Sequence, residues 1–130
     1  MGYLSELPMA LVPGARICDS AVLRDGEAGV RFDLDRSGYR TSAFVVRHAG
    51  VARAYLNRCA HKFVELDWEP GEFFDSDRQY LVCATHGALY EPDSGYCVAG
   101  PCRGARLIPV AVREADGGVW LAEAPVDVLK

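Results

Sequence analysis

The feature that most constrains the fold of this chain is the absence of a long amphipathic helical pattern. No segment of about 12 residues or more keeps the 3.6-residue apolar period of a helix. Short apolar runs recur instead, and glycines and prolines separate them along the whole chain. Short runs divided by turn-forming residues are typical of β-strands. The sequence therefore predicts an all-β fold.

The predicted strands group into two hairpins and several single strands. One hairpin spans Ala43–Leu56 and turns at Ala49-Gly50, and the other spans Leu107–Ala122 and turns at Asp116-Gly117-Gly118. Residues 65–77 read as a loop with one helical turn. A chain of 130 residues suits one domain, which we expect to span 1–130. The apolar runs predicted as strands are Ala15–Cys18, Val30–Leu34, Ala43–His48, Val51–Leu56, Tyr80–Cys83, Leu107–Val112 and Val119–Ala122.

Composition and charge exclude several classes of function. Half of the residues are hydrophobic and 25% are charged, as in ordinary globular proteins. The net charge of −4 argues against nucleic-acid binding, which needs a basic face. No apolar run approaches the ~20 residues of a membrane span. The first residues lack a basic segment and a long apolar segment, so we expect no signal peptide and a cytoplasmic location.

Cysteine and histidine gather in two short motifs. The chain has five cysteines, an odd number that fits a disulfide framework poorly. In a cytosolic protein, clustered cysteine and histidine indicate metal or redox chemistry. The motifs are Cys59-Ala60-His61 and Cys83-Ala84-Thr85-His86, and residues 62–82 lie between them. Each motif follows a predicted strand, so two neighbouring loops can supply four ligands to one site.

The chemistry of these ligands leaves more than one metal open. Thiolates bind iron well, and imidazole binds iron or zinc. In one type of [2Fe–2S] centre, two cysteines bind one iron and two histidines bind the other. A structural zinc site is the alternative, although zinc does not need the flanking Gly87, Tyr90 and Gly100-Pro101. A nucleophilic cysteine–histidine pair is disfavoured, because no third orienting group or oxyanion hole accompanies either motif.

At these residues the sequence resembles the Rieske iron–sulfur domain family. Cys59-x-His61 looks like the first Rieske box, and Cys83-x-x-His86-Gly87 looks like the second. Gly87-Ala88-Leu89-Tyr90-x-x-x-x-Gly95 resembles the glycine and aromatic pattern behind the second box. Gly100-Pro101 resembles the proline loop that covers the cluster, and LIPVAVREADGGVWLA resembles the closing hairpin. The resemblance covers Phe44 to Ala122.

The resemblance implies a fold, a cofactor and a function. The expected fold is the Rieske fold, an antiparallel β-sandwich base with a small cluster-binding subdomain. The expected cofactor is one [2Fe–2S] cluster, held by Cys59, His61, Cys83 and His86. The expected function is one-electron transfer as a ferredoxin component that serves an oxygenase or reductase system, not catalysis. Its expected partners are redox proteins, a reductase and a terminal acceptor, with no nucleic acid and no membrane.

Comparison within the family narrows the subclass. Val64 and Thr85 stand where respiratory Rieske proteins have two further cysteines, so that disulfide cannot form here. Oxygenase subunits add a mononuclear iron that needs two histidines and a carboxylate. The chain has three histidines, so the two boxes leave His48 alone. A small non-catalytic Rieske subunit of a larger reductase remains as an alternative to a free ferredoxin.

Two residues near the second box bear on the reduction potential. High-potential relatives carry a serine two residues after the second histidine, and its hydroxyl bonds a bridging sulfide. This chain has Ala88 there. Tyr90 matches a tyrosine that bonds a cysteine sulfur in those relatives, although it also suits a core aromatic position. We therefore expect a potential in the lower half of the Rieske range of roughly −150 to +300 mV.

The pair of cysteines around Gly100-Pro101 and the acidic segment 65–77 can each be interpreted in two ways. Cys97 and Cys102 flank Gly100-Pro101 and are either a reversible disulfide that stiffens the loop or two partly buried thiols. Cys18 is expected to be a small core residue. The acidic segment is either a surface that attracts a basic redox partner or a solvated loop. Its six carboxylates are Glu65, Asp67, Glu69, Glu72, Asp75 and Asp77.

Overall fold

The computed structural model of the chain describes residues 10–36, 38–60, 64–67, 69–85, 87–102 and 104–122. These residues form short and medium strands and one 3-10 turn, η2 (Ser20–Val22), which confirms the all-β prediction. The strands are β1 (Arg16–Asp19), β2 (Val30–Arg36), β3 (Tyr39–His48), β4 (Val51–Leu56), β5 (Leu81–Val82), β6 (Leu89–Tyr90), β7 (Cys97–Ala99), β8 (Pro109–Val110), β9 (Val112–Ala115) and β10 (Gly118–Leu121).

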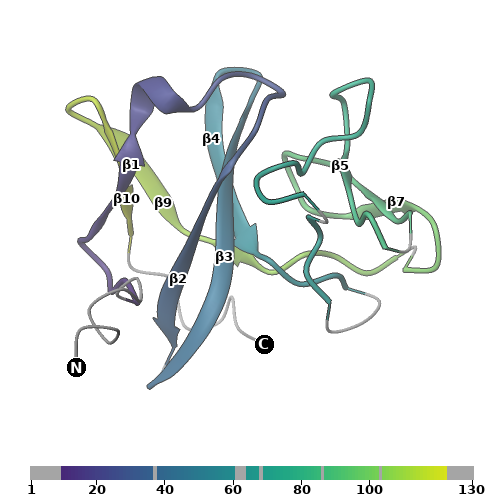
Figure 1. Cartoon of the computed structure of the whole chain (residues 1–130), viewed down its shortest axis with the longest axis horizontal. Helices are drawn as coiled ribbons and strands as arrows, with labels where there is room; N and C mark the ends of the chain where they lie inside the picture. Colours follow the sequence, from purple (N-terminus) through teal and green to yellow (C-terminus); the bar gives the residue numbers. More distant parts are fainter. Residues whose placement is uncertain are drawn as a thin grey trace.

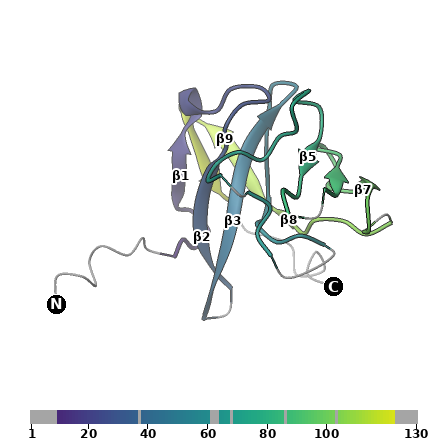
Figure 2. The ribbon, with the colours of Figure 1, turned by 45° about the vertical axis from the view of Figure 1, so that its right-hand side comes forward.

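The strands form three antiparallel sheets. The four-stranded sheet has the order β2-β3-β4-β8, and the two three-stranded sheets have the orders β1-β10-β9 and β5-β6-β7. Figure 1 shows β2, β3 and β4 in the centre, with β1, β9 and β10 on one side and β5 and β7 on the other. In the turned view of Figure 2, β1 still lies on one side of β2 and β3, and β5 and β7 lie on the other. The first two sheets therefore make the sandwich, and β5-β6-β7 makes a separate lobe beside it.

Strand β3 is buried on both faces because it lies between the sandwich and the lobe. Its four residues Ala43–Val46 are fully buried, where a half-exposed strand would alternate. Val45 packs with Val119 of β10 inside the sandwich. Phe44 belongs to the core of the lobe and stacks on Phe73, with ring centroids 3.9 Å apart. One strand thus joins both hydrophobic cores.

The hairpin predicted over Ala43–Leu56 is confirmed. Strands β3 and β4 pair in register from Ala43 opposite Leu56 to His48 opposite Val51. The turn residues Ala49 and Gly50 both have positive φ, 52° and 82°. That geometry is typical of a two-residue type I′ turn, whose twist matches that of the strands.

The strand predicted over Leu107–Val112 is wrong, because the chain changes sheet within it. β8 pairs with β4 at the edge of the four-stranded sheet, whereas β9 begins at Val112 and pairs with β10. Pro109 has no amide N–H for a sheet, so an edge position suits it. The predicted turn is correct at Asp116-Gly117, but Gly118 already belongs to β10.

Other differences concern short elements. The sequence did not predict β6 and β7, which have two and three residues. The predicted strand Tyr80–Cys83 shrinks to β5. The described part of the segment 65–77 contains no helical turn, and Phe74 bridges to Leu81 there. Among the described residues, no helix is long and apolar enough to cross a membrane.

Candidate metal centre

The first cysteine motif begins where β4 ends, and a side-chain clamp closes its loop. The Asn57 side chain accepts a hydrogen bond from the Leu66 amide at 2.9 Å and donates one to Asp67 at 3.0 Å. The Cys59 amide donates to the Val64 carbonyl at 2.8 Å. Both ends of the loop are therefore fixed, and Cys59 is held 3% exposed.

Asp67 is a buried carboxylate that anchors the same loop. Its second oxygen accepts the Gly71 amide at 2.9 Å and lies 3.5 Å from Nε of Arg31. A buried carboxylate needs such partners, because its desolvation is otherwise costly. Arg31 also pairs with Glu65 at 2.6 Å. Asp67 therefore serves the structure, and it does not add to an acidic surface that a partner would meet.

The second cysteine motif lies at a tight turn between β5 and β6. Cys83 follows β5 directly and is fully buried. Its amide donates to the Ala88 carbonyl at 2.9 Å, and its carbonyl accepts the Gly87 amide at 2.7 Å. The Ala84 amide donates to the Leu66 carbonyl at 2.9 Å, which ties the second loop to the first. The two motifs thus lie side by side in the lobe.

The Tyr90 hydroxyl links the first motif to the loop after β7. Tyr90 is fully buried, and its oxygen lies 3.2 Å from the sulfur of Cys59. It accepts the Ala60 amide at 3.0 Å and lies 3.2 Å from the sulfur of Cys102. A hydroxyl has one proton and two lone pairs. With Ala60 and Cys102 donating to the oxygen, its own proton is directed to Cys59.

The protonation of this cluster follows mainly from its burial. Burial, together with the hydrogen bonds that join Tyr90 to Cys102 and Cys59, raises the pKa of Tyr90 above its ordinary value, so the phenol stays protonated. Burial and the hydrogen bond with Cys97 raise the pKa of the Cys102 thiol to about 11. At neutral pH, Cys102 is therefore a neutral S–H group, whose one proton can be donated to the Tyr90 oxygen or to the sulfur of Cys97.

The loop that carries Gly100-Pro101 packs against the turn of the second motif. Gly100 has φ +100°, and a Cβ there would lie 2.8 Å from Cα of Ala88. Only glycine fits so close to the backbone at this φ. Ala88 is fully buried under the loop, while Gly100 and Pro101 are exposed. Ala88 also has no hydroxyl, so its side chain offers no donor at this place.

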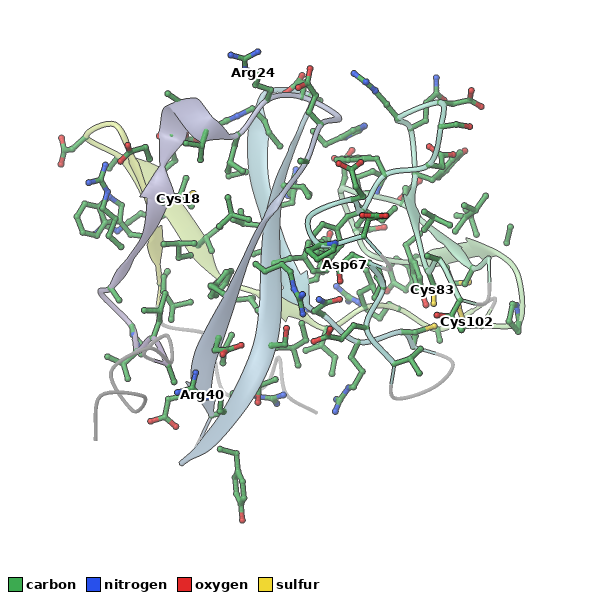
Figure 3. All side chains as sticks on the ribbon, viewed as in Figure 1. Cys18, Arg24, Arg40, Asp67, Cys83 and Cys102 are labelled. Atoms are coloured by element: carbon green, nitrogen blue, oxygen red, sulfur yellow. The ribbon has the colours of Figure 1, made fainter. Side chains whose placement is uncertain are left out.

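The described structure brings together part of the predicted ligand set. Cys59 and Cys83 belong to one buried cluster with Tyr90 and Ala88, and Figure 3 shows Cys83 and Cys102 in the lobe, far from Cys18. His61 and His86 lie outside the described residues. Without them, the described ranges contain no group of three or more metal-ligating side chains.

Some residues of the site lie outside the sequence motifs. Asn57 and Asp67 clamp the first loop, yet neither belongs to a motif with a known spacing. The only sequence signal for Asn57 is its position, because it follows the end of β4 and comes two residues before Cys59. His48 contacts Asp93 through Nδ1 at 2.9 Å and takes no part in the cysteine cluster.

The donor set of the described residues fits an iron–sulfur cluster. Two buried cysteines, Cys59 and Cys83, offer thiolates, the ligands that iron–sulfur clusters use. A phenol proton faces the sulfur of Cys59, where a thiolate gains most from a hydrogen bond. The apolar surroundings keep water from both sulfurs. The residues present therefore suit a cluster that bridges the two loops.

Comparison with known proteins identifies the family. The family model of the Rieske [2Fe-2S] domain matches residues 15–117, most of the chain. The chain belongs to the Rieske [2Fe-2S] domain family, and its cofactor is one [2Fe–2S] cluster. The match begins well before Phe44, so it includes β1 and β2 of the sandwich. A comparison with curated proteins gave no match.

Solved structures share the fold at low sequence identity. The ferredoxin of carbazole 1,9a-dioxygenase from Nocardioides aromaticivorans IC177 is 20% identical, with a TM-score of 0.65, and the match covers 87% of this chain and 100% of that one. The Sphingomonas yanoikuyae B1 ferredoxin is 22% identical, with a TM-score of 0.63 and coverages of 85% and 99%. The terminal oxygenase of the Nocardioides enzyme is 22% identical, with a TM-score of 0.67, but only 30% of that chain is covered against 87% of this one.

Proposed function

We propose that the protein is a ferredoxin that carries single electrons from a reductase to an oxygenase. Cys59 and Cys83 hold one iron of the cluster, and His61 and His86 hold the other. When bound, the cluster takes up and releases one electron at a time. The protein is thus an electron carrier and not a catalyst. We also propose that residues 1–130 form one domain and that it acts in the cytoplasm.

The observation that supports the ligand assignment is that Cys59 and Cys83 are both buried and that their two loops are hydrogen-bonded to each other. Cys59 and Cys83 come from different strands, yet the Ala84–Leu66 hydrogen bond holds their loops together. A cluster needs ligands from both loops within a few ångströms. His61 and His86 follow these cysteines by two and three residues, so the same loops carry them.

The residues around the cysteines each have a defined task. Tyr90 donates its proton toward the sulfur of Cys59, which favours negative charge on that sulfur. The Asn57–Asp67 clamp fixes the two ends of the first loop to each other. Gly100 and Ala88 pack together and keep the proline loop close to the second motif.

Two observations support an oxygenase as the electron acceptor. The match covers 100% of the ferredoxin of carbazole 1,9a-dioxygenase and 99% of the Sphingomonas yanoikuyae B1 ferredoxin, but only 30% of a terminal oxygenase. Another structure of similar fold is a complex of reduced oxygenase and oxidized ferredoxin in carbazole 1,9a-dioxygenase. A small chain with this fold can therefore dock on an oxygenase as a separate protein.

Metal analysis of ligand variants tests the assignment. Anaerobically purified protein should contain two irons and two acid-labile sulfides per chain, with a visible spectrum and a reduced-state EPR signal of a Rieske cluster. Cys59→Ser, Cys83→Ser, His61→Ala and His86→Ala should each lose or severely destabilise the cluster. Cys18→Ser and His48→Ala are the matched controls and should keep it. A normal spectrum in any ligand variant, or zinc in place of iron, would overturn the ligand set.

Electron delivery is tested separately. The chemically reduced protein should be reoxidised rapidly when mixed with a Rieske oxygenase in a stopped-flow experiment, and no reoxidation should occur without it under anaerobic conditions. Copurification of the protein in a fixed ratio with a large reductase subunit would favour the subunit alternative. Failure with a panel of oxygenases would contradict the proposed acceptor while leaving the cluster assignment intact.

A further inference from the structure

Cys97 and Cys102 form a close sulfur pair that the proposed function does not use. Cys97 is the first residue of β7, and Cys102 follows the Gly100-Pro101 loop. Both are thiols, 5% and 6% exposed. Their sulfur atoms lie 2.7 Å apart. A disulfide has a length of about 2.05 Å, so the sulfurs need to approach by roughly 0.7 Å to bond.

The backbone holds both cysteines at this approach. The Cys97 amide donates to the Ala105 carbonyl at 2.9 Å, and the Ala105 amide donates to the Cys102 carbonyl at 2.8 Å. Ala105 thereby holds both cysteines, one at each end of the loop. The loop between them is exposed to solvent at Gly100 and Pro101.

The sulfur pair is connected to a cluster ligand through one hydroxyl. The S–H of Cys102 has two acceptors, the Tyr90 oxygen at 3.2 Å and the sulfur of Cys97 at 2.7 Å, and the Tyr90 oxygen lies 3.2 Å from the sulfur of Cys59. A donor to the oxygen polarises the O–H group and strengthens the bond that this group makes in turn. A disulfide has no S–H, so closure of the bridge removes that donor.

We infer that Cys97 and Cys102 are a redox-active dithiol whose oxidation to a disulfide lowers the reduction potential of the cluster. The proposal rests on the proposed function in taking Cys59 as a cluster ligand. Without the Cys102 donor, the hydrogen bond from Tyr90 to the sulfur of Cys59 weakens. That bond favours the reduced, more negative cluster, so its weakening favours the oxidised cluster. The carrier would hold its electron less firmly in an oxidising environment.

The oxidant is a low-molecular-weight disulfide such as glutathione disulfide. One cysteine thiolate attacks a sulfur of the oxidant and forms a mixed disulfide, and one glutathione thiol leaves. The second cysteine then attacks the protein sulfur of the mixed disulfide, and the second glutathione thiol leaves. Two protein thiols are oxidised and one glutathione disulfide is reduced to two thiols. The protons that the cysteines lose are taken up by the glutathione products.

Thiol mapping and potentiometry on the cluster-loaded protein test the two parts. The protein is brought to equilibrium anaerobically with defined glutathione and glutathione disulfide ratios, then denatured, alkylated and mapped by mass spectrometry. We expect a Cys97–Cys102 bridge, with Cys18 alkylated throughout as the internal control. The bridged protein should show a two- to tenfold shift of the cluster equilibrium toward the oxidised form, up to about 59 mV for one electron.

Variants separate the formation of the disulfide from its effect on the reduction potential of the cluster. Cys97→Ser keeps the Cys102 donor but cannot form the disulfide. The reduction potential of its cluster should therefore equal that of the wild-type dithiol form at every glutathione ratio. Cys102→Ala removes the donor without a bridge and should show the potential of the bridged form. Absence of the bridge at equilibrium overturns the dithiol, and a bridge without a shift in potential overturns the link through Tyr90. If the protein takes up no iron and sulfide, the proposed function fails, whereas the mapping still reports on the dithiol.

Discussion

At the scale of single residues, the Tyr90 hydroxyl is the group best placed to set the potential. Tyr90→Phe removes the donor that lies 3.2 Å from the sulfur of Cys59. Each hydrogen bond to a ligand sulfur stabilises the reduced cluster more than the oxidised one. A difference of ~1 kcal/mol corresponds to roughly 40 mV for one electron. We therefore expect the potential to fall by several tens of millivolts, measured by redox titration.

A second buried tyrosine provides the control for this prediction. Tyr55 is 3% exposed and donates its hydroxyl to the Pro92 carbonyl at 2.6 Å. Tyr55→Phe therefore loses a buried hydrogen bond of similar kind without touching a cysteine sulfur. Its potential should stay at the wild-type value. Equal shifts in the two variants would mean that the potential reports on general loosening of the lobe and not on the hydroxyl.

At the scale of elements, one ion pair joins the two sheets of the sandwich. Arg47 of β3 contacts both carboxylate oxygens of Glu114 in β9, at 3.1 and 2.6 Å. Its guanidinium also donates to the Leu23 carbonyl at 2.9 Å. The hydrogen bond from Arg47 lowers the pKa of Glu114, and the same bond raises the pKa of Arg47. The pair therefore favours the ionised carboxylate in the folded state.

Glu114→Gln should reduce the free energy of unfolding, and the loss should depend on pH. A carboxyl whose folded pKa is lowered stabilises the fold above its unfolded pKa of about 4.3. That contribution disappears as the pH falls through the lower folded pKa. For this partly exposed pair we expect about 0.5–1 kcal/mol at pH 7, allowing for solvent screening. The measurement is urea unfolding of wild type and variant in parallel from pH 7 to below 4.

The control is an ion pair of the same type in a more exposed place. Glu27 lies 3.7 Å from Arg78, and both side chains are largely exposed. Glu27→Gln should change stability little at any pH. A gap between wild type and Glu114→Gln that persists unchanged at low pH would contradict the role of the ionised carboxylate.

The elements also show what the sequence could and could not predict. The hairpin over 43–56 followed from an apolar pattern and a turn that both act locally. The change of sheet between β8 and β9 did not, because it depends on which neighbour each half of the run meets after folding. The strands β6 and β7 are too short to carry a period, and pairing with each other defines them.

The residues of the candidate site also fall into those that the sequence could predict and those that it could not. Both cysteine boxes could be predicted, because ligand spacing within a loop is local in the sequence. The clamp of Asn57 and Asp67 could not, since its members are common polar residues whose partners are fixed by the tertiary fold. The 2.7 Å distance between the sulfurs of Cys97 and Cys102 also depends on the tertiary fold. Their separation of five residues in the sequence is compatible both with free thiols and with a disulfide.

At the scale of the whole molecule, the sandwich and the lobe differ in what holds them together. The sandwich has two packed sheets and its own apolar clusters, for example Val45 with Val119. In the lobe, strands of two and three residues surround the two cysteine motifs. The hydrogen bonds of the lobe join loops and turns more than they extend strand ladders. We therefore expect the cluster, as a cross-link between the two loops, to contribute a large share of the stability of the lobe.

Removal of the cluster should accordingly loosen the lobe and spare the sandwich. Hydrogen exchange on the cluster-loaded and cluster-free proteins is the measurement. The amides of Cys59, Ala84 and Gly87 make hydrogen bonds inside the two ligand loops, and they should lose most of their protection without the cluster. The amides of Val45 and Ala54, in the central sheet, serve as the internal reference and should exchange at similar rates in both forms. Equal protection of the ligand loops in both forms would show that the Asn57–Asp67 clamp and the packing of the lobe suffice. A uniform loss in both parts would instead show that the chain folds as one cooperative unit around its cluster.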